Sequence, residues 1–201
     1  MFYRPEDGHG LPRNPFKAVV APRPVGWISS RDVDGTENIA PYSFFNAVAD
    51  EPPQVMFAST GAKTDQKGSK DSVSNIRRTG IFCVNIVEHA MRTQMNATSG
   101  DYGKDVDEFA CAGLARAPCE TIPCSRVAGA PAALECRLTK IVRLRGEANC
   151  MMLGEVTGIH LRDDCLSDGR FDVLKCQPLA RLGYRDYARI TELFEMTRPS
   201  D

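Results

Sequence analysis

The sequence has almost no net charge, little aromatic content and no long apolar run. Its 25 Lys and Arg residues nearly balance 26 Asp and Glu residues, so the formal net charge is −1. A protein that coats nucleic acid needs a basic face for the phosphates, and this balance argues against one. No apolar stretch of the 201 residues approaches the roughly 18 residues of a membrane span. We therefore expect neither nucleic acid nor a membrane among the partners.

Signals for export and for metal binding are also scarce. Residues 1–15 contain charged side chains instead of an apolar run, so we expect no secretory signal and a cytoplasmic location. The eight cysteines lack the closely spaced pairs of structural zinc sites. Disulfide scaffolds are usually short secreted chains, which this sequence does not resemble. We expect no metal site and interpret most cysteines as reduced core residues.

Motifs for two large enzyme classes are missing. The chain has no Gly-x-Ser-x-Gly and no Gly-x-Gly-x-x-Gly. It also lacks the alternation of strands and helices that predicts a parallel nucleotide-binding sheet. The three histidines, His9, His89 and His160, have no nucleophile at a suggestive spacing, and we interpret them as surface or structural residues. No catalytic acid or base is predicted.

The chain is divided into many short elements by 13 prolines and 16 glycines, and its hydrophobic fraction of 42% is enough to build a core. Asp34-Gly35 predicts a hairpin, and Gly154 and Gly158 predict a bulge or a close backbone approach. Strands are expected at 25–30, 38–40, 54–59, 81–87, 133–145 and 151–161, and helices at 71–78, 88–98 and 187–194. This pattern predicts a mainly β fold with peripheral helices, arranged as a closed or nearly closed antiparallel barrel.

An aromatic stretch at residues 40–46 is a candidate wall for a planar ligand. Tyr42 and Phe44 offer flat apolar faces, while Ser43 offers a hydroxyl that could fix a ligand's orientation. An aromatic core strand with a polar edge would show the same pattern. The residues alone therefore leave both interpretations open.

A second stretch, residues 63–76, combines lysines and hydroxyls with the start of a predicted helix. Lys67, Lys70 and Ser72 could join the free N–H groups and the positive end of the helix dipole to hold a phosphate. We interpret Asp71 as the N-cap of the helix or as a hydrogen-bond acceptor. A solvated loop that caps an ordinary helix is the alternative.

Arg181 is the third candidate residue. It lies in the largely apolar segment 178–187, where a fixed guanidinium usually has an anionic partner. That partner could be a ligand or a carboxylate of the protein itself, and the sequence favours neither. Arg181 is therefore a candidate anion-binding residue.

Several segments, taken in order, resemble the flavin reductase-like, FMN-binding split-barrel family. Each segment is a weak signal by itself, but their joint order over roughly residues 17–190 is specific. The segments are 23–30, 34–35, 38–46, 52–53, 70–76, 84–85, 107–109, 112–114, 134–136, 154–156 and 178–183.

The resemblance implies a six-stranded Greek-key split barrel in residues 17–201, after an N-terminal extension of residues 1–16. It also implies a homodimer, with FMN at or near the dimer interface. Three groups of residues would bind the cofactor. Trp27, Ile28 and Ser29 would line the isoalloxazine ring; Tyr42, Ser43 and Phe44 would contact the ring and the ribityl chain; Ser59, Lys67, Lys70, Asp71, Ser72 and Asn75 would hold the ribityl and phosphate end, with Arg181 as a further anchor.

The activity implied by the resemblance is that of an NAD(P)H:flavin oxidoreductase. Hydride from NADH or NADPH would arrive at N5 of FMN, and the electrons would pass to an acceptor or to a partner oxygenase. Two departures point to an alternative: Tyr184 stands where the family often has a second glycine, and the C-terminal region lacks the histidine often found near the nicotinamide site. The alternative is a flavoredoxin-like electron carrier that is served by a protein donor. A flavin-free structural barrel is the third interpretation.

Overall fold

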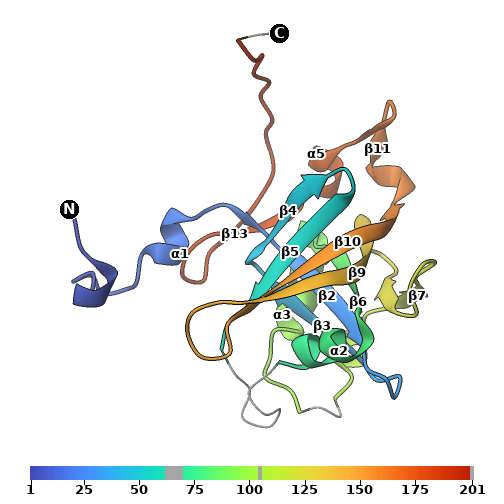
Figure 1. The fold of residues 1–201 in the computed structure, drawn as a ribbon. Helices are drawn as coiled ribbons and strands as arrows, with labels where there is room; N and C mark the ends of the chain where they lie inside the picture. The colour runs from blue at the N-terminus through green and yellow to red at the C-terminus, as the bar shows by residue number, and fades with distance from the viewer. Residues whose placement is uncertain (62–69, 104–105, 200–201) are drawn as a thin grey trace.

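A strongly curved antiparallel sheet forms the centre of the molecule (Figure 1). The structure, a computed structural model, describes residues 1–61, 70–103 and 106–199. The sheet has 7 strands in the order β3-β2-β6-β9-β10-β5-β4. Their bounds are β2 (Gly26–Arg31), β3 (Glu37–Tyr42), β4 (Phe45–Asp50), β5 (Pro53–Ser59), β6 (Ile81–Ile86), β9 (Ala132–Arg143) and β10 (Cys150–Leu161). The predicted mainly β, antiparallel barrel is confirmed.

The two edge strands of this sheet, β3 and β4, follow each other directly in the chain. Only Ser43 and Phe44 separate them, and the Ala58 N–H on β5 donates a hydrogen bond of 2.8 Å to the Phe44 carbonyl. The sheet therefore curls until its first strand, β3, contacts β5, the strand next to its last, and the two ends enclose a common interior. This closure places the aromatic segment 40–46 at the seam of the barrel.

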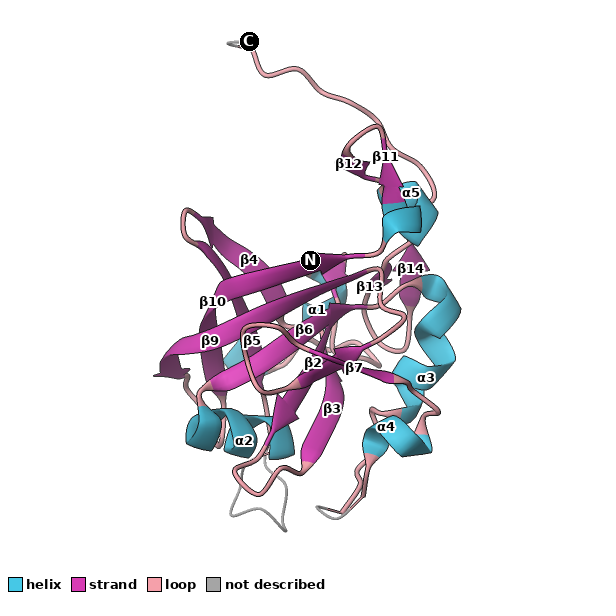
Figure 2. Ribbon diagram, turned by 90° about the vertical axis from the view of Figure 1, so that its right-hand side faces the viewer, coloured by secondary structure: helices cyan, strands magenta, loops and turns pink. Residues whose placement is uncertain are grey.

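Short elements surround the barrel (Figure 2). Three small sheets have the strand orders β1-β13-β14, β7-β8 and β11-β12. Their strands are β1 (Arg23–Pro24), β7 (Arg116–Pro118), β8 (Ser125–Val127), β11 (Leu166–Ser167), β12 (Arg170–Phe171), β13 (Leu179–Arg181) and β14 (Tyr187–Arg189). The α-helices are α1 (Phe16–Val19), α2 (Asp71–Thr79), α3 (Arg92–Ala97), α4 (Glu108–Cys111) and α5 (Val173–Cys176), and the 3-10 helices are η1 (Pro5–Asp7), η2 (His89–Met91) and η3 (Asp163–Cys165). None of the helices in the described ranges is long and apolar enough to cross a bilayer.

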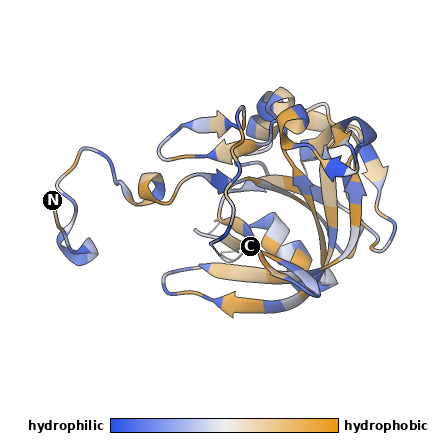
Figure 3. Ribbon diagram, turned by 90° about the horizontal axis from the view of Figure 1, so that it is seen from above, coloured by the Kyte–Doolittle hydropathy of each residue, from blue (hydrophilic) through white to orange (hydrophobic). Residues whose placement is uncertain are grey.

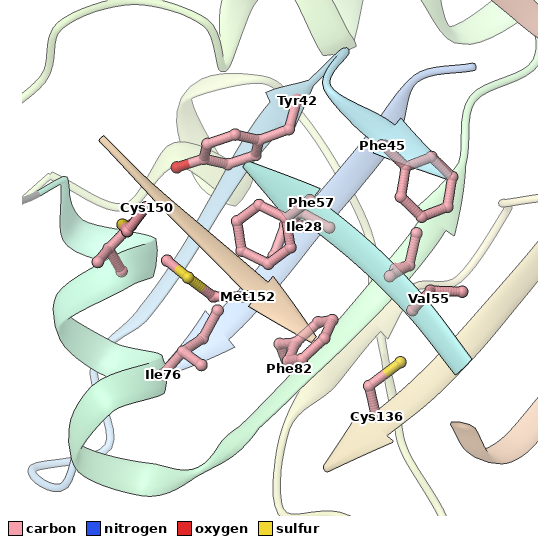
Figure 4. Packing of buried hydrophobic residues seen from close by; sticks show 12 residues of the cluster. Ile28, Tyr42, Phe45, Val55, Phe57, Ile76, Phe82, Cys136, Cys150 and Met152 are labelled. Atoms are coloured by element: carbon pink, nitrogen blue, oxygen red, sulfur yellow. The ribbon is translucent and has the colours of Figure 1, made fainter. Parts of the chain in front are cut away.

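Alternating apolar side chains of the strands fill the barrel (Figure 4). Phe57 is fully buried, and its ring centroid lies 4.8 Å from that of Tyr42 and 5.5 Å from that of Phe82. A second cluster, which includes Trp27 and Met95, packs between the sheet and α3. Most of the cysteines are buried, as expected of core residues, whereas Cys111 is exposed and Cys119 is half-buried. The interior thus supports Tyr42 from behind.

Both glycines of β10 behave as predicted. The pairing of β9 with β10 shifts register at Leu153/Gly154 and again at Val156/Gly158. A Cβ atom on Gly154 would lie 2.4 Å from Cζ of Phe82, which no side-chain packing tolerates. Glycine is therefore required at position 154 because the Phe82 ring occupies the space of its missing side chain.

Two expectations about the elements are wrong or incomplete. The predicted helix over 187–194 is absent: Tyr187–Arg189 pairs with β13, and residues 190–199 form neither helix nor strand. Strand β4 was not expected, because Phe45 is its only buried residue and no alternation is visible in the sequence. The sheet consequently has one strand more than the six implied by the resemblance.

Glu135 on β9 is a fully buried carboxylate that four donor atoms surround. It accepts hydrogen bonds from the N–H groups of Glu120 (2.7 Å) and Thr121 (2.6 Å), from the Thr121 hydroxyl (2.6 Å) and from Nε2 of His160 (2.5 Å). Burial raises the pKa of this carboxyl, but the hydrogen bonds outweigh burial and bring the pKa to about 2. His160 is thus a structural residue, in agreement with the interpretation of the histidines as surface or structural residues.

The lowered pKa of Glu135 predicts a pH-dependent stability. A depressed carboxyl pKa adds stability above the unfolded value, 4.5, and this contribution is lost as the pH falls towards about 2. Its full size is about 3 kcal/mol. Urea unfolding between pH 6 and pH 3 should therefore show a steeper loss for the unmodified protein than for Glu135→Gln. Equal slopes for the two proteins would contradict this assignment.

Candidate functional site

A polar pocket of about 280 Å³ lies between β3, the start of α2 and the loop that follows α3. We call it the α2 pocket. Its lining residues are Asn38, Ala40, Pro41, Tyr42, Lys70, Asp71, Ser72, Thr98, Ser99, Gly100, Asp101 and Glu108. The pocket therefore unites the two predicted stretches, because Tyr42 comes from the aromatic stretch and Lys70, Asp71 and Ser72 come from the helix start.

The start of α2 forms one wall of the α2 pocket. The N-cap residue is Lys70, with φ −73° and ψ 154°, and Asp71 is the first helical residue. The prediction that Asp71 is the N-cap is therefore wrong. A lysine side chain has no acceptor, so the side chain of the N-cap residue makes no capping hydrogen bond. This wall consequently combines the positive end of the helix with an ammonium group.

Tyr42 forms the facing wall. Its ring is 6% exposed, and Nζ of Lys70 lies 5.6 Å from the ring centroid, within the range of a cation–π contact. The Tyr42 hydroxyl is buried without a hydrogen-bond partner among the described residues. Burial raises the pKa of Tyr42 to about 12, and the neighbouring Ser72 and Ser59 hydroxyls oppose this shift. A neutral phenol donor thus remains for a ligand atom.

Buried hydrogen bonds hold the floor of the α2 pocket. The Ser72 hydroxyl donates to Oδ1 of Asn38 at 2.6 Å, and Nδ2 of Asn38 donates to Oε1 of Glu108 at 2.5 Å. This chain of bonds joins α2, β3 and α4. Arg116 fixes α4 from outside through Asp107 at 2.5 Å, the residue before the helix. The pocket residues are therefore held in place before any ligand arrives.

The side chains of Trp27, Ile28 and Ser29 do not line the pocket. All are buried: Trp27 and Ile28 belong to the two core clusters, and the Ser29 hydroxyl donates to the Ser125 carbonyl at 2.7 Å. These side chains therefore support the pocket from within the core, and the expectation that the three residues line the isoalloxazine ring stays a prediction. Trp27 gives the most direct support, because its Nε1 donates to the Thr98 hydroxyl at 2.8 Å and Thr98 lines the pocket.

Three other predicted residues lie beside the pocket or outside the described part of the chain. Ser59 is buried at the end of β5 near the Tyr42 hydroxyl. Asn75 is a buried residue of α2, and its Nδ2 donates to the Ser30 hydroxyl at 3.3 Å. Lys67 falls in residues 62–69, outside the described residues.

A second pocket, of about 360 Å³, lies on the other side of the segment 41–44. We call it the arginine pocket. Its lining residues are Asn14, Phe16, Lys17, Arg23, Ser43, Arg181, Leu182 and Tyr184. The neighbouring Phe44 ring lies 5.7 Å from Nζ of Lys17 and 5.9 Å from Cζ of Arg23. Predicted residues Ser43, Phe44 and Arg181 therefore gather here, apart from Tyr42 and Lys70.

The sequence left open whether the partner of Arg181 is a ligand or a carboxylate of the protein itself. Its guanidinium donates to the Tyr187 hydroxyl and, at 2.6 Å, to the Tyr184 carbonyl, and it stacks 4.4 Å from the Tyr187 ring centroid. It contacts no carboxylate in the part of the chain that the structure describes. Arg181 therefore forms no buried ion pair with the described part of the protein.

Sequence reasoning missed several pocket residues. Asn38 and Glu108 lie in segments that carried the resemblance, but no local pattern distinguishes them as pocket residues. Arg23 begins a segment that carried the resemblance and Thr98 lies in none, but neither was predicted as a pocket residue, because their roles depend on partners far away in the chain. A larger groove of about 480 Å³, next to His89 and Arg189, contains none of the predicted residues. The described residues contain no cluster that could hold a metal ion.

Comparison with known proteins agrees with this architecture. Residues 20–184 match the model of the flavin reductase like domain. An uncharacterized protein of Deinococcus radiodurans is 37% identical over 189 residues, which cover 90% of this chain and 82% of that protein. The match to the domain model therefore spans both pockets except for the N-terminal side of the arginine pocket.

Solved structures with the same fold include proteins of known activity. The 2-nitrobenzoate 2-nitroreductase of Pseudomonas fluorescens is 30% identical, with a TM-score of 0.80 over 92% of this chain and 89% of its own. Nitrilotriacetate monooxygenase component B of Bacillus cereus is 27% identical, with a TM-score of 0.88 over 98% of both chains. Flavoredoxin of Desulfovibrio vulgaris, at 21% identity and a TM-score of 0.78 over 90% of this chain and 93% of its own, shows the fold alone. From the match to the domain model, the chain belongs to the flavin reductase-like family, which supports a flavin-related oxidoreductase role.

Proposed function

We propose that the chain is an FMN-dependent oxidoreductase that takes electrons from NADH or NADPH and passes them to an acceptor or to a partner oxygenase. The observation that carries the proposal is the α2 pocket. In this pocket the N-terminus of α2 and the Lys70 ammonium lie across from Tyr42, whose hydroxyl is buried without a hydrogen-bond partner among the described residues. Such a donor set suits a phosphate that continues into a chain of hydroxyl groups.

The lining of the α2 pocket suits one end of FMN in its chemistry, and the pocket volume limits how much of the cofactor it would hold. The α2 pocket, at about 280 Å³, is just below the usual range of about 300–1,000 Å³ for ligand pockets. It would therefore hold only the phosphate and ribityl end. The segment 41–44 leads from this pocket to Ser43 and Phe44, where a planar ring system would find an aromatic face.

Each wall of the α2 pocket has a distinct proposed task. Lys70 and the first turn of α2 would bind the phosphate, and Ser72 would stay fixed by Asn38. The Tyr42 hydroxyl would donate to a ligand oxygen, which would end the cost of its burial without a partner. Asp71 would accept from a ribityl hydroxyl. FMN, when bound, would supply the redox chemistry, so the protein needs no acid or base of its own.

One observation favours the second candidate, an electron carrier of the flavoredoxin type. Neither the α2 pocket nor the arginine pocket has a histidine among its described lining residues. Tyr184 also adopts a left-handed backbone, φ +55°, at the place where the family often has glycine, and its side chain borders the arginine pocket. A bulky ring at this position would hinder a nicotinamide that approaches from this side.

We further propose a homodimer, because the single chain leaves apolar surface on one edge of its fold. In β4 only Phe45 is buried, and Val48 is 50% exposed. The N-terminal segment extends away from the barrel and carries the apolar helix α1, in which Val19 is 78% exposed (Figure 3). An exposed edge strand with apolar side chains is a surface that proteins normally cover. Light scattering should give the mass of two chains, and a monomer at micromolar concentration would oppose this proposal.

Anaerobic reduction separates the enzyme from the carrier. Purified protein loaded with FMN is mixed with NADH or with NADPH, and the visible absorbance of the flavin is followed without oxygen. The proposed enzyme loses this absorbance with at least one of the two donors. If both donors leave the absorbance unchanged, while dithionite bleaches it, the oxidoreductase proposal fails and the carrier takes its place.

A further inference from the structure

The arginine pocket contains a buried positive charge that no acidic side chain of the described residues balances. Arg23 is 7% exposed, and its guanidinium donates to the carbonyls of Lys17 (2.5 Å), Val20 and Leu182 (2.7 Å). Its Nε atom is buried without a hydrogen-bond partner among the described residues. Carbonyl groups satisfy donors but do not neutralise a charge. Arg23 is consequently a buried cation with neutral partners only, which is an unfavourable arrangement in the absence of an anion.

A second and a third cation increase this imbalance. Arg181 lines the same pocket, and the pKa of Arg23 is lowered first by burial and then by the charge of Arg181. Lys17 is also part of the lining. No acidic side chain belongs to the described lining of this pocket. Three cations around one cavity therefore create a field that attracts an anion.

The pocket also offers flat apolar surface. Phe16 and Tyr184 are lining residues with 60% and 41% of their surface exposed, and the Phe44 ring lies beside Arg23. Guanidinium groups bind carboxylates with two parallel hydrogen bonds, and aromatic rings stack on planar ligands. The combination suits a planar acid better than a compact inorganic ion.

Close contact keeps the two sides of this pocket together. A Cβ atom on Gly183 would lie 2.3 Å from Cβ of Ala18, so the turn between β13 and β14 fits directly against α1. Arg23 ties the same parts together through Lys17 and Leu182. The cavity is thus formed by a fixed junction of the N-terminal segment with the β13–β14 turn.

We propose that the arginine pocket binds a small aromatic carboxylic acid as its anion. Arg181 and Lys17 hold the carboxylate, Arg23 contributes its field from beneath, and the ring lies against Phe16 and Tyr184. The site adjoins Ser43 and Phe44, against which the proposed function would place the planar ring of FMN. A role for the acid as the electron acceptor rests on the proposed function, whereas its binding does not.

Calorimetry with benzoate tests this proposal on the flavin-free protein. Benzoate should bind, while benzamide, which has the same ring without the charge, and cyclohexanecarboxylate, which has the charge without the aromatic ring, should bind more weakly. Arg181→Gln should weaken benzoate binding by about tenfold or more, because a charge-assisted hydrogen bond is lost. Lys17→Met should weaken it as well and serves as the test if Arg181→Gln does not fold. Arg143→Gln, an exposed residue on β9 outside the pocket, should leave it unchanged.

Three results would overturn the proposal. Absence of benzoate binding excludes the site, and equal binding of benzoate and benzamide excludes its electrostatic basis. If inorganic phosphate or NADPH binds as tightly as benzoate and loses the same affinity in Arg181→Gln, the aromatic acid is not the ligand. The site would then bind a simple anion or a dinucleotide. An FMN titration of the same samples separates the two proposals: bound FMN without benzoate binding refutes only this one, and the reverse refutes only the flavin site.

Discussion

Replacement of Phe57 by alanine is expected to lower the free energy of unfolding by about 3–5 kcal/mol, the cost of emptying a large buried aromatic site. Phe57 is fully buried at the centre of the barrel, between Tyr42 and Phe82. Urea unfolding measures this loss directly. Since the ring supports Tyr42 from behind, FMN affinity should decrease in the same variant even under conditions where it stays folded.

Val48→Ala is the matched control for Phe57→Ala. Val48 lies on β4, the strand paired with β5, but it is 50% exposed. Its replacement should change the stability of the isolated chain by about 0.5 kcal/mol or less. Similar losses in the two variants would mean that the barrel interior is not the main source of stability. If the two chains of a dimer meet through β4, Val48→Ala should weaken their association. The variant dimer would then dissociate at a higher protein concentration than the unmodified dimer when both are diluted.

The second large effect is expected for Lys70→Ala. We expect FMN binding to weaken by about 1–3 kcal/mol, the range for the loss of one charge-assisted hydrogen bond to the phosphate. That corresponds to a rise of about 5-fold to 150-fold in the dissociation constant. Flavin fluorescence quenching in a titration with FMN gives the constant directly.

Two comparisons make the Lys70 result specific. Lys140→Ala removes the same charge from an exposed position on β9, outside both pockets, and should leave FMN binding unchanged. Urea unfolding of Lys70→Ala separates a lost phosphate contact from a loss of stability, because Nζ of Lys70 also lies 5.6 Å from the Tyr42 ring centroid. An unchanged dissociation constant in Lys70→Ala would remove this residue from the phosphate site.

The parts of the fold that follow from local patterns could be predicted. Strand β9 alternates apolar and polar residues and could be predicted from that pattern. Gly154 correctly predicted a bulge or close backbone approach, because the Phe82 ring occupies the space of its missing side chain. The final segment shows the limit of such reasoning. Tyr187 and Ile190 recur at helical spacing, but β14 pairs with β13 instead, and no helix face would have been buried. Long-range pairing decides such short elements.

Pocket residues could be predicted where one stretch of the sequence contains both the reactive or polar side chains and the signal for the strand or helix that positions them. Tyr42, Lys70 and Ser72 met this condition and lie together in the α2 pocket. Trp27 did not, because its side chain turns inward to Thr98 and supports the wall from behind. Arg23 could not be recognised, since its burial depends on carbonyls of Lys17 and Leu182 that come from opposite ends of the chain.

The central claim is that the α2 pocket holds the phosphate of FMN. The most direct measurement compares FMN with riboflavin, which lacks the phosphate, in parallel fluorescence titrations of the flavin-free protein. FMN should bind at least about tenfold more tightly, since in this account the first turn of α2 and the Lys70 ammonium would contact the phosphate end alone. This advantage should disappear in Lys70→Ala. Equal affinity of the unmodified protein for both flavins, or no binding of either, would contradict the account.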